Sequence, residues 1–144
     1  MARMPAGYST RPLPDKLGIK AGARIALVGA PQGYEGTLGK LPPGTQRAKA
    51  LRGPLDLIQA FVKSRAELAR RFPALKKAMA IDGALWVSWP KKASGVATDL
   101  DENAIREIGL AQGLVDVKVC AVDETWSGLK FVYRLADRGK ATRN

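Results

Sequence analysis

Two glycines, Gly29 and Gly33, directly follow the apolar run at residues 24–28 and are the first candidates for chemistry. Glycine in such a place lets backbone amides come close to a phosphate or a carboxylate. The same pattern also suits a tight turn between a strand and a helix, and two glycines are fewer than a nucleotide-binding fingerprint contains. Ligand contact and simple turn formation are both open interpretations.

A basic loop follows residues 84–89 and offers groups that suit an anion. It supplies two ammonium groups, a hydroxyl and a flexible backbone, from Lys91, Lys92, Ser94 and Gly95. The order and spacing of these residues exclude a P-loop. A solvated basic loop is the alternative, although loops that follow strands are where ligand contacts concentrate.

The segment at residues 123–128 places carboxylates, hydroxyls and an indole together. Trp126 can stack on a base or another flat ligand, and Asp123 is a further candidate contact in the same loop. Alternatively, Asp123 and Glu124 pair with Lys91 and Lys92 and lock the two loops together. A metal site is not predicted, because hard cations need more oxygen ligands than these residues supply.

The composition excludes several kinds of catalytic site. The chain has no histidine, which removes Ser–His and Cys–His pairs and imidazole metal ligands. Its single cysteine, Cys120, excludes an intrachain disulfide and a cysteine-rich zinc site, and we expect it to be a buried small residue. The sequence therefore assigns no catalytic residue and no cofactor, and it leaves open whether the protein is an enzyme.

The net charge of +11 is unevenly distributed and favours an acidic partner. Residues 1–98 carry 17 lysines and arginines against 5 acidic residues, whereas residues 99–137 carry 4 against 8. Such a surface attracts nucleotides, nucleic acids and acidic proteins, unless it is simply solvated. No run is long and apolar enough for a membrane helix or a signal peptide, so we expect a cytoplasmic protein without membrane contact.

Strands and helices alternate along the chain and would position these loops. Apolar or alternating runs predict strands at residues 24–28, 46–51, 55–62, 84–89, 115–122 and 129–135. Ser64 to Glu67 forms a capping box that begins a helix ending at Asp82–Gly83, with a kink or break at Pro73. A further helix should begin at Thr98 or Asp99 and end at Gly113.

This order predicts a Rossmann-like α/β fold. We expect a mostly parallel sheet of about five to six strands, helices on both faces, and a C-terminal antiparallel strand reached by a hairpin. A single domain should cover residues 7–136, with flexible tails at 1–6 and 137–144. In such a sheet the loops that follow the strands meet at one edge, where ligands bind, and all the candidate residues lie in those loops.

The runs KKASGVATDL and DETWSGLKF resemble those of a small bacterial family known only as a domain of unknown function. The resemblance covers roughly Gly7 to Tyr133 and supplies no activity. More distantly, the glycine loop, the strand with Asp56, the turn before Trp86 and the closing hairpin resemble class I S-adenosylmethionine methyltransferases. That resemblance implies a trimmed version of their fold. In this sequence Val28 stands where those enzymes have an acid, and no acid ends the next strand.

Three functions follow as hypotheses. The first is a small-ligand-binding domain for an anionic or nucleotide-like molecule, with or without a reaction of its own. The second is a nucleic-acid-binding protein that uses the basic face of the helix after Ser64, which has no interleaved stacking aromatics. The third is an interaction module for an acidic protein partner.

Overall fold

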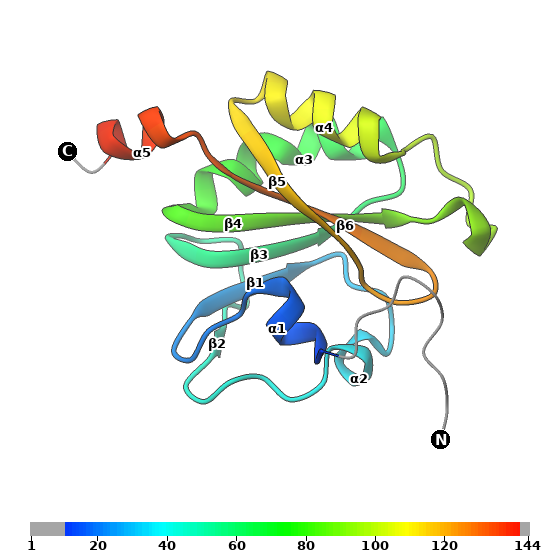
Figure 1. Ribbon diagram of the computed structural model, residues 1–144, viewed down its shortest axis with the longest axis horizontal. Helices are drawn as coiled ribbons and strands as arrows, with labels where there is room; N and C mark the ends of the chain where they lie inside the picture. Colours follow the sequence, from blue (N-terminus) through cyan, green and yellow to red (C-terminus); the bar gives the residue numbers. More distant parts are fainter. Residues whose placement is uncertain (1–10, 142–144) are drawn as a thin grey trace.

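The computed structural model describes residues 11–141, which form a six-stranded mixed sheet with helices on both faces (Figure 1). The strands are β1 (Arg24–Val28), β2 (Gln46–Arg47), β3 (Leu55–Phe61), β4 (Met79–Pro90), β5 (Leu114–Ala121) and β6 (Trp126–Tyr133), in the spatial order β2-β1-β3-β4-β6-β5. The first four are parallel, and β6 runs antiparallel to both β4 and β5. The predicted Rossmann-like fold with an antiparallel C-terminal strand is confirmed.

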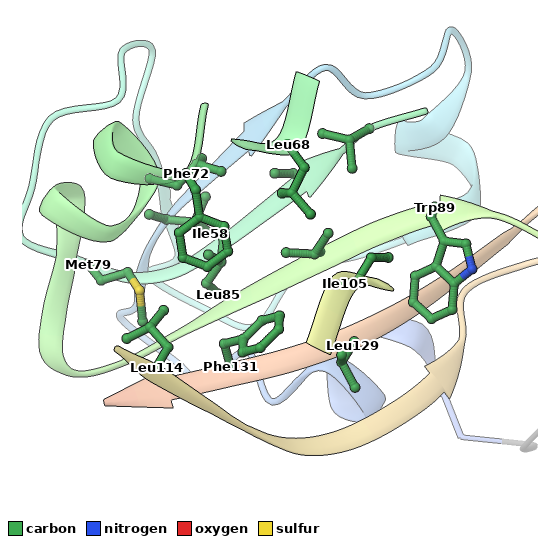
Figure 2. Packing of buried hydrophobic residues seen from close by; sticks show 14 of the residues in the cluster. Ile58, Leu68, Phe72, Met79, Leu85, Trp89, Ile105, Leu114, Leu129 and Phe131 are labelled. Carbon is green, nitrogen blue, oxygen red and sulfur yellow. The ribbon is translucent and has the colours of Figure 1, made fainter. Parts of the chain in front are cut away.

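Helices cover the two faces of the sheet unequally. The helices α1 (Leu13–Leu17) and α2 (Tyr34–Leu38) are short and pack on one face, while α3 (Arg65–Ala78) and α4 (Glu102–Ala111) pack on the other (Figure 1). Figure 2 shows the larger apolar core under α3 and α4, with Phe72 and Phe131 in edge-to-face contact at 5.9 Å between ring centroids. Among the described residues, no helix has the length and apolar character needed to cross a membrane.

Two tryptophans of β4 lie in different cores. Trp89 belongs to the core under α3 and α4 (Figure 2), whereas Trp86 lies in the core beneath α1 and α2. The indole of Trp86 is fully buried and donates a hydrogen bond to the Leu17 carbonyl at 2.8 Å. Residues three apart point to opposite sides of a strand, which is why these two side chains lie in separate cores.

The capping box of α3 forms as predicted. Ser64 Oγ accepts a hydrogen bond from the Glu67 amide at 3.0 Å, and the Glu67 carboxylate accepts one from the Lys63 amide at 3.0 Å. Pro73 lies inside the helix without splitting it. Proline removes the hydrogen bond to the carbonyl of Ala69, but both residues are exposed, so that water can solvate this carbonyl.

Several predicted boundaries are wrong for identifiable reasons. Asp82–Gly83 does not end a helix but lies within β4, where the pairing with β3 shifts register. The helix α4 is capped by Asp101, whose carboxylate accepts a hydrogen bond from the Ala104 amide at 2.8 Å. Thr98 instead donates to the carbonyl of Lys63, which precedes α3, and the Asp99 carboxylate accepts from the amide of Arg65, the first residue of α3.

The remaining differences concern short segments. The strand predicted at residues 46–51 pairs only over Gln46–Arg47. The C-terminal tail predicted from residue 137 begins inside the helix α5 (Leu135–Ala141). The predicted tail at residues 1–6, together with residues 142–144, lies outside the described residues.

Candidate ligand-binding site at the carboxyl edge of the sheet

The loops after β1, β3 and β4 and the β5–β6 hairpin meet at one edge of the sheet. A Cβ atom on Gly29 would lie 2.9 Å from the carbonyl oxygen of Phe61, at the end of β3. The ring of Phe61 lies 5.0 Å from that of Trp126, measured between centroids. The backbone amide of Lys91 donates to the Thr125 carbonyl at 2.8 Å. The structure therefore brings together segments that the sequence placed at a common edge.

The glycine loop has the backbone conformation that requires glycine. Gly29 and Gly33 adopt φ angles of 69° and 82°, in the left-handed region that other residues rarely enter. Gly29 lies against the backbone of β3, whereas a Cβ on Gly33 would meet nothing within 4 Å. Gly33 also caps the N-terminus of α2. The two glycines thus have separate tasks, close packing at Gly29 and an open backbone at Gly33.

Three aromatic rings form a row beneath this edge. Tyr34 and Phe61 lie 4.7 Å apart in edge-to-face geometry, and Phe61 contacts Trp126 in the same way. Trp126 is only 7% exposed because its indole packs against Phe61 in the core beneath this edge. Stacking of Trp126 on a ligand, as the sequence suggested, would need part of this contact to open.

A buried polar chain that the sequence analysis missed runs through the same region. The Tyr34 hydroxyl donates to Gln59 Oε1 at 2.6 Å, and Gln59 Nε2 donates to Ser88 Oγ at 3.3 Å. Gln59 and Ser88 are fully buried, and burial raises the pKa of the Tyr34 phenol above its ordinary value. The signal available in the sequence was the position of Gln59 within the largely apolar residues 55–62 and of Ser88 within residues 84–89.

The basic loop is joined to the hairpin, but not through carboxylates. Lys91 Nζ donates to the Asp123 carbonyl oxygen at 2.7 Å. The Asp123 carboxylate accepts hydrogen bonds from the amides of Thr125 and Trp126, both at 2.8 Å. The link between the loops therefore runs from an ammonium group to a backbone carbonyl, while the carboxylate shapes its own turn.

Some other groups of the basic loop form hydrogen bonds within the loop, and others are exposed to solvent. The Ser94 hydroxyl donates to the Lys91 carbonyl at 2.6 Å and accepts from the Val96 amide at 3.2 Å. Lys92 and Gly95 are exposed, and Gly95 adopts a φ angle of 75°. Of the predicted contacts, Gly33, Lys92 and Gly95 present open backbone or charge, whereas Lys91 and Ser94 hold the loop in shape.

Neither metal nor thiolate chemistry is evident at this edge. Within residues 11–141, no group of three or more histidine, cysteine, aspartate or glutamate residues is placed to hold a metal ion. Cys120 is buried, and burial raises the pKa of its thiol, so that the prediction of a small core residue is confirmed.

Comparison with known proteins identifies the fold. No family model and no curated protein matches this sequence. A SAM-dependent methyltransferase from Aquifex aeolicus superimposes with a TM-score of 0.61 at 13% identity, over 81% of this chain and 85% of its own. Magnesium protoporphyrin IX methyltransferase from Synechocystis PCC 6803 with bound SAM gives 0.54 at 14% identity, over 85% and 74%. A Methanococcus jannaschii fibrillarin pre-rRNA processing protein gives 0.53 at 13%, over 88% and 70%.

These likenesses define the class of fold and no more. The chain has a methyltransferase-like Rossmann fold, as its more distant resemblance implied, and a fold alone does not carry an activity. Membership of the domain-of-unknown-function family stays a prediction.

The end of β2 lacks one acid that related nucleotide-binding folds use. In dinucleotide-binding relatives of this architecture, an acid near the end of the second strand holds ribose hydroxyls. Here β2 ends at Arg47, whose guanidinium pairs with Glu35 of α2, and Lys49 follows as an exposed residue. S-adenosylmethionine carries a net positive charge, which the exposed ammonium group of Lys49 opposes, whereas the charge of Arg47 is matched by Glu35.

Proposed function

We propose that the protein is a small-ligand-binding domain whose carboxyl edge takes an anionic, nucleotide-like molecule. The observation that supports this most is that the open left-handed backbone of Gly33 and the exposed Lys63 and Lys92 all lie in loops that follow parallel strands, at the same edge of the sheet. Backbone amides and ammonium groups together are the donor set that phosphate groups prefer. The proposal concerns binding, and it assigns no reaction.

Each predicted contact has a role in this proposal. Gly33, Lys92 and Gly95 face the anionic group directly. Gly29 lets the loop after β1 lie against β3, and Lys91 and Ser94 fix the basic loop. The Asp123 carboxylate accepts an amide hydrogen bond that holds the hairpin turn. Trp126 packs against Phe61 beneath the proposed site.

A thermal-shift comparison of ATP, ADP, S-adenosylmethionine and S-adenosylhomocysteine tests the proposal. Ligand at about 100 times its Kd adds about 2.7 kcal/mol of stability, which corresponds to a rise of several degrees in Tm. We expect the phosphorylated nucleotides to raise Tm and the cationic S-adenosylmethionine to raise it less. Stabilisation by S-adenosylmethionine alone would reverse the charge argument, and no shift with any of the four would contradict the proposal.

A pair of lysine variants locates the site. Lys92→Ala should weaken the nucleotide-induced shift, because Lys92 is an exposed ammonium group on the basic loop. Lys77→Ala is the matched control, since Lys77 is an exposed lysine of α3. Equal loss in both variants would indicate binding through net charge only, without a site at this edge.

Contacts of α3 argue against the nucleic-acid alternative. The side chain of Arg65 donates to the Asp99 carbonyl, Lys76 donates to the Gln112 carbonyl, and Arg71 pairs with Glu67. Several of the cations on this helix are therefore engaged within the protein. Retention on RNA that falls steeply with salt would restore that alternative, and salt-resistant binding of an acidic protein would favour the interaction module.

A further inference from the structure

A cavity lies at the opposite edge of the sheet, away from the loops described above. Its volume is about 470 Å³, within the range of small-molecule pockets. Four segments line it: the loop after α1, the first residues of β3, the register shift in β4 and the last half of β6. Its lining residues include Gly18, Lys20, Asp56, Asp82, Lys130 and Val132. Because β6 runs antiparallel to β4, its late residues lie beside the early residues of β4.

The floor of this cavity is apolar and rigid. Leu17 is fully buried, Leu57 is 3% exposed and Ala84 is 7% exposed, and all three line the cavity. A ligand can therefore lay a carbon skeleton on a fixed surface, as in most small-molecule sites.

Lys20 and Lys130 line the cavity, and Lys118 lies beside Lys130 on the neighbouring strand; these three lysines form a cation cluster. Lys130 on β6 pairs in register with Lys118 on β5, and like charges directly opposite each other destabilise a sheet. Burial lowers the pKa of Lys130, and the charges of Lys118 and Lys20 lower it further. Within residues 11–141, no hydrogen bond or ion pair joins any of these three side chains to the protein. Among the described residues, no carboxylate therefore lies within ion-pair distance of the ammonium groups of this cluster.

Two carboxylates face the cavity from other elements. Asp56 uses one oxygen to accept a hydrogen bond from the Arg24 amide at 2.8 Å, and Asp82 is exposed at the register shift of β4. These oxygens are acceptors for hydroxyl or amino groups. The cavity thus combines cations, acceptors and an apolar floor.

We propose that this amino-edge cavity is a second binding site, for a small molecule that carries a phosphate or carboxylate group and hydroxyl or amino donors. The anionic group lies at Lys20 and Lys130, and the donors point to Asp56 and Asp82. The site is separate from the proposed nucleotide site, and it does not depend on it.

Labelling with pyridoxal 5′-phosphate tests this proposal on the full chain. The probe carries a phosphate for the cation cluster and an aldehyde for a lysine amine. The amine attacks the aldehyde carbon, water leaves, and borohydride adds hydride to the resulting C=N bond to give a stable secondary amine. Peptide mass spectrometry should find Lys130 or Lys20 labelled several-fold more than Lys77, and inorganic phosphate should protect them. Labelling without preference, or without protection by either phosphate or citrate, would overturn the site.

Lys130→Met supplies an independent check. It should weaken the phosphate protection of any label that remains on Lys20 and remove the label at position 130, while Lys77→Met leaves both intact. The variant keeps the apolar stem and relieves repulsion within the cluster, so we expect it to be folded and at least as stable as the parent. If it does not fold, phosphate protection in the parent protein decides alone. The carboxylate arm of the same assay replaces phosphate with citrate, and protection by one anion only identifies the preferred group.

Discussion

Gly29 shows how a single residue controls the candidate site. Its φ angle of 69° and the carbonyl of Phe61 at 2.9 Å from a Cβ position both oppose any side chain. Gly29→Ala should therefore lower the free energy of unfolding more than Gly33→Ala, which has only the left-handed strain of about 1–2 kcal/mol. Urea denaturation of both variants measures the difference. Equal losses would show that the loop moves away from β3 without cost.

Tyr34 predicts an alkaline limit of stability. Its phenol keeps a proton in the folded protein at pH values where an unfolded tyrosine, with its ordinary pKa of 10.0, has lost it. The folded state then binds more protons than the unfolded state, so the free energy of unfolding falls as pH rises above 10.0. The fall approaches about 1.4 kcal/mol per pH unit for one group.

Tyr34→Phe separates this effect from general alkaline denaturation. The variant leaves Gln59 Oε1 buried without its donor, which should cost about 1–3 kcal/mol at pH 7. Above pH 10 its stability should decline less steeply than that of the parent. Parallel pH profiles in thermal unfolding would show that the phenol ionises without penalty.

The residue types of the candidate site could be predicted from the sequence, but their hydrogen bonds could not. Glycine after a strand and lysines in a loop are local signals. Whether Ser94 faces a ligand or its own turn depends on where the Lys91 carbonyl lies, and that is set by the hairpin it contacts. The burial of Trp126 against Phe61 likewise depends on strand pairing across residues far apart in the chain.

At the scale of elements, α4 depends on a glycine inside the helix. A Cβ on Gly109 would lie 2.1 Å from an atom of the Phe131 ring, which is fully buried and cannot move aside. Glycine to alanine in a helix normally adds up to about 1 kcal/mol of stability, but overpacking costs about 1–3 kcal/mol. Gly109→Ala should therefore destabilise the protein, as measured by urea denaturation.

Gly36→Ala provides the opposite expectation in α2. A Cβ there meets nothing within 4 Å, and its φ angle is not positive, so alanine should be neutral or stabilising. If Gly109→Ala were stabilised like Gly36→Ala, the contact between α4 and β6 would be looser than the packing of Phe131 implies.

Elements with strong local signals were the predictable ones. The capping box at Ser64 and the apolar runs of β1, β3 and β4 are local patterns formed by residues that are neighbours in the sequence. Asp82–Gly83 looks like a turn, but pairing of β4 with β3 extends the strand through it. Asp101 caps α4 because Asp99, an equally good cap by type, is drawn to the Arg65 amide at 2.8 Å. Tertiary contacts decided both cases.

At the scale of the whole molecule, the two proposed sites lie at opposite edges of one sheet and should be independent. The seven residues of β3 separate them by about 20 Å at ~3.3 Å per residue. Screening at physiological salt acts over about 8 Å, so a charge placed at one edge is weakly felt at the other. Protein carrying the reduced pyridoxyl phosphate on Lys130 should therefore bind ATP with the same Kd as protein treated with borohydride alone. Calorimetric titration measures both, and a large loss of ATP affinity after labelling would mean that the edges are coupled or that the nucleotide occupies the amino-edge cavity itself.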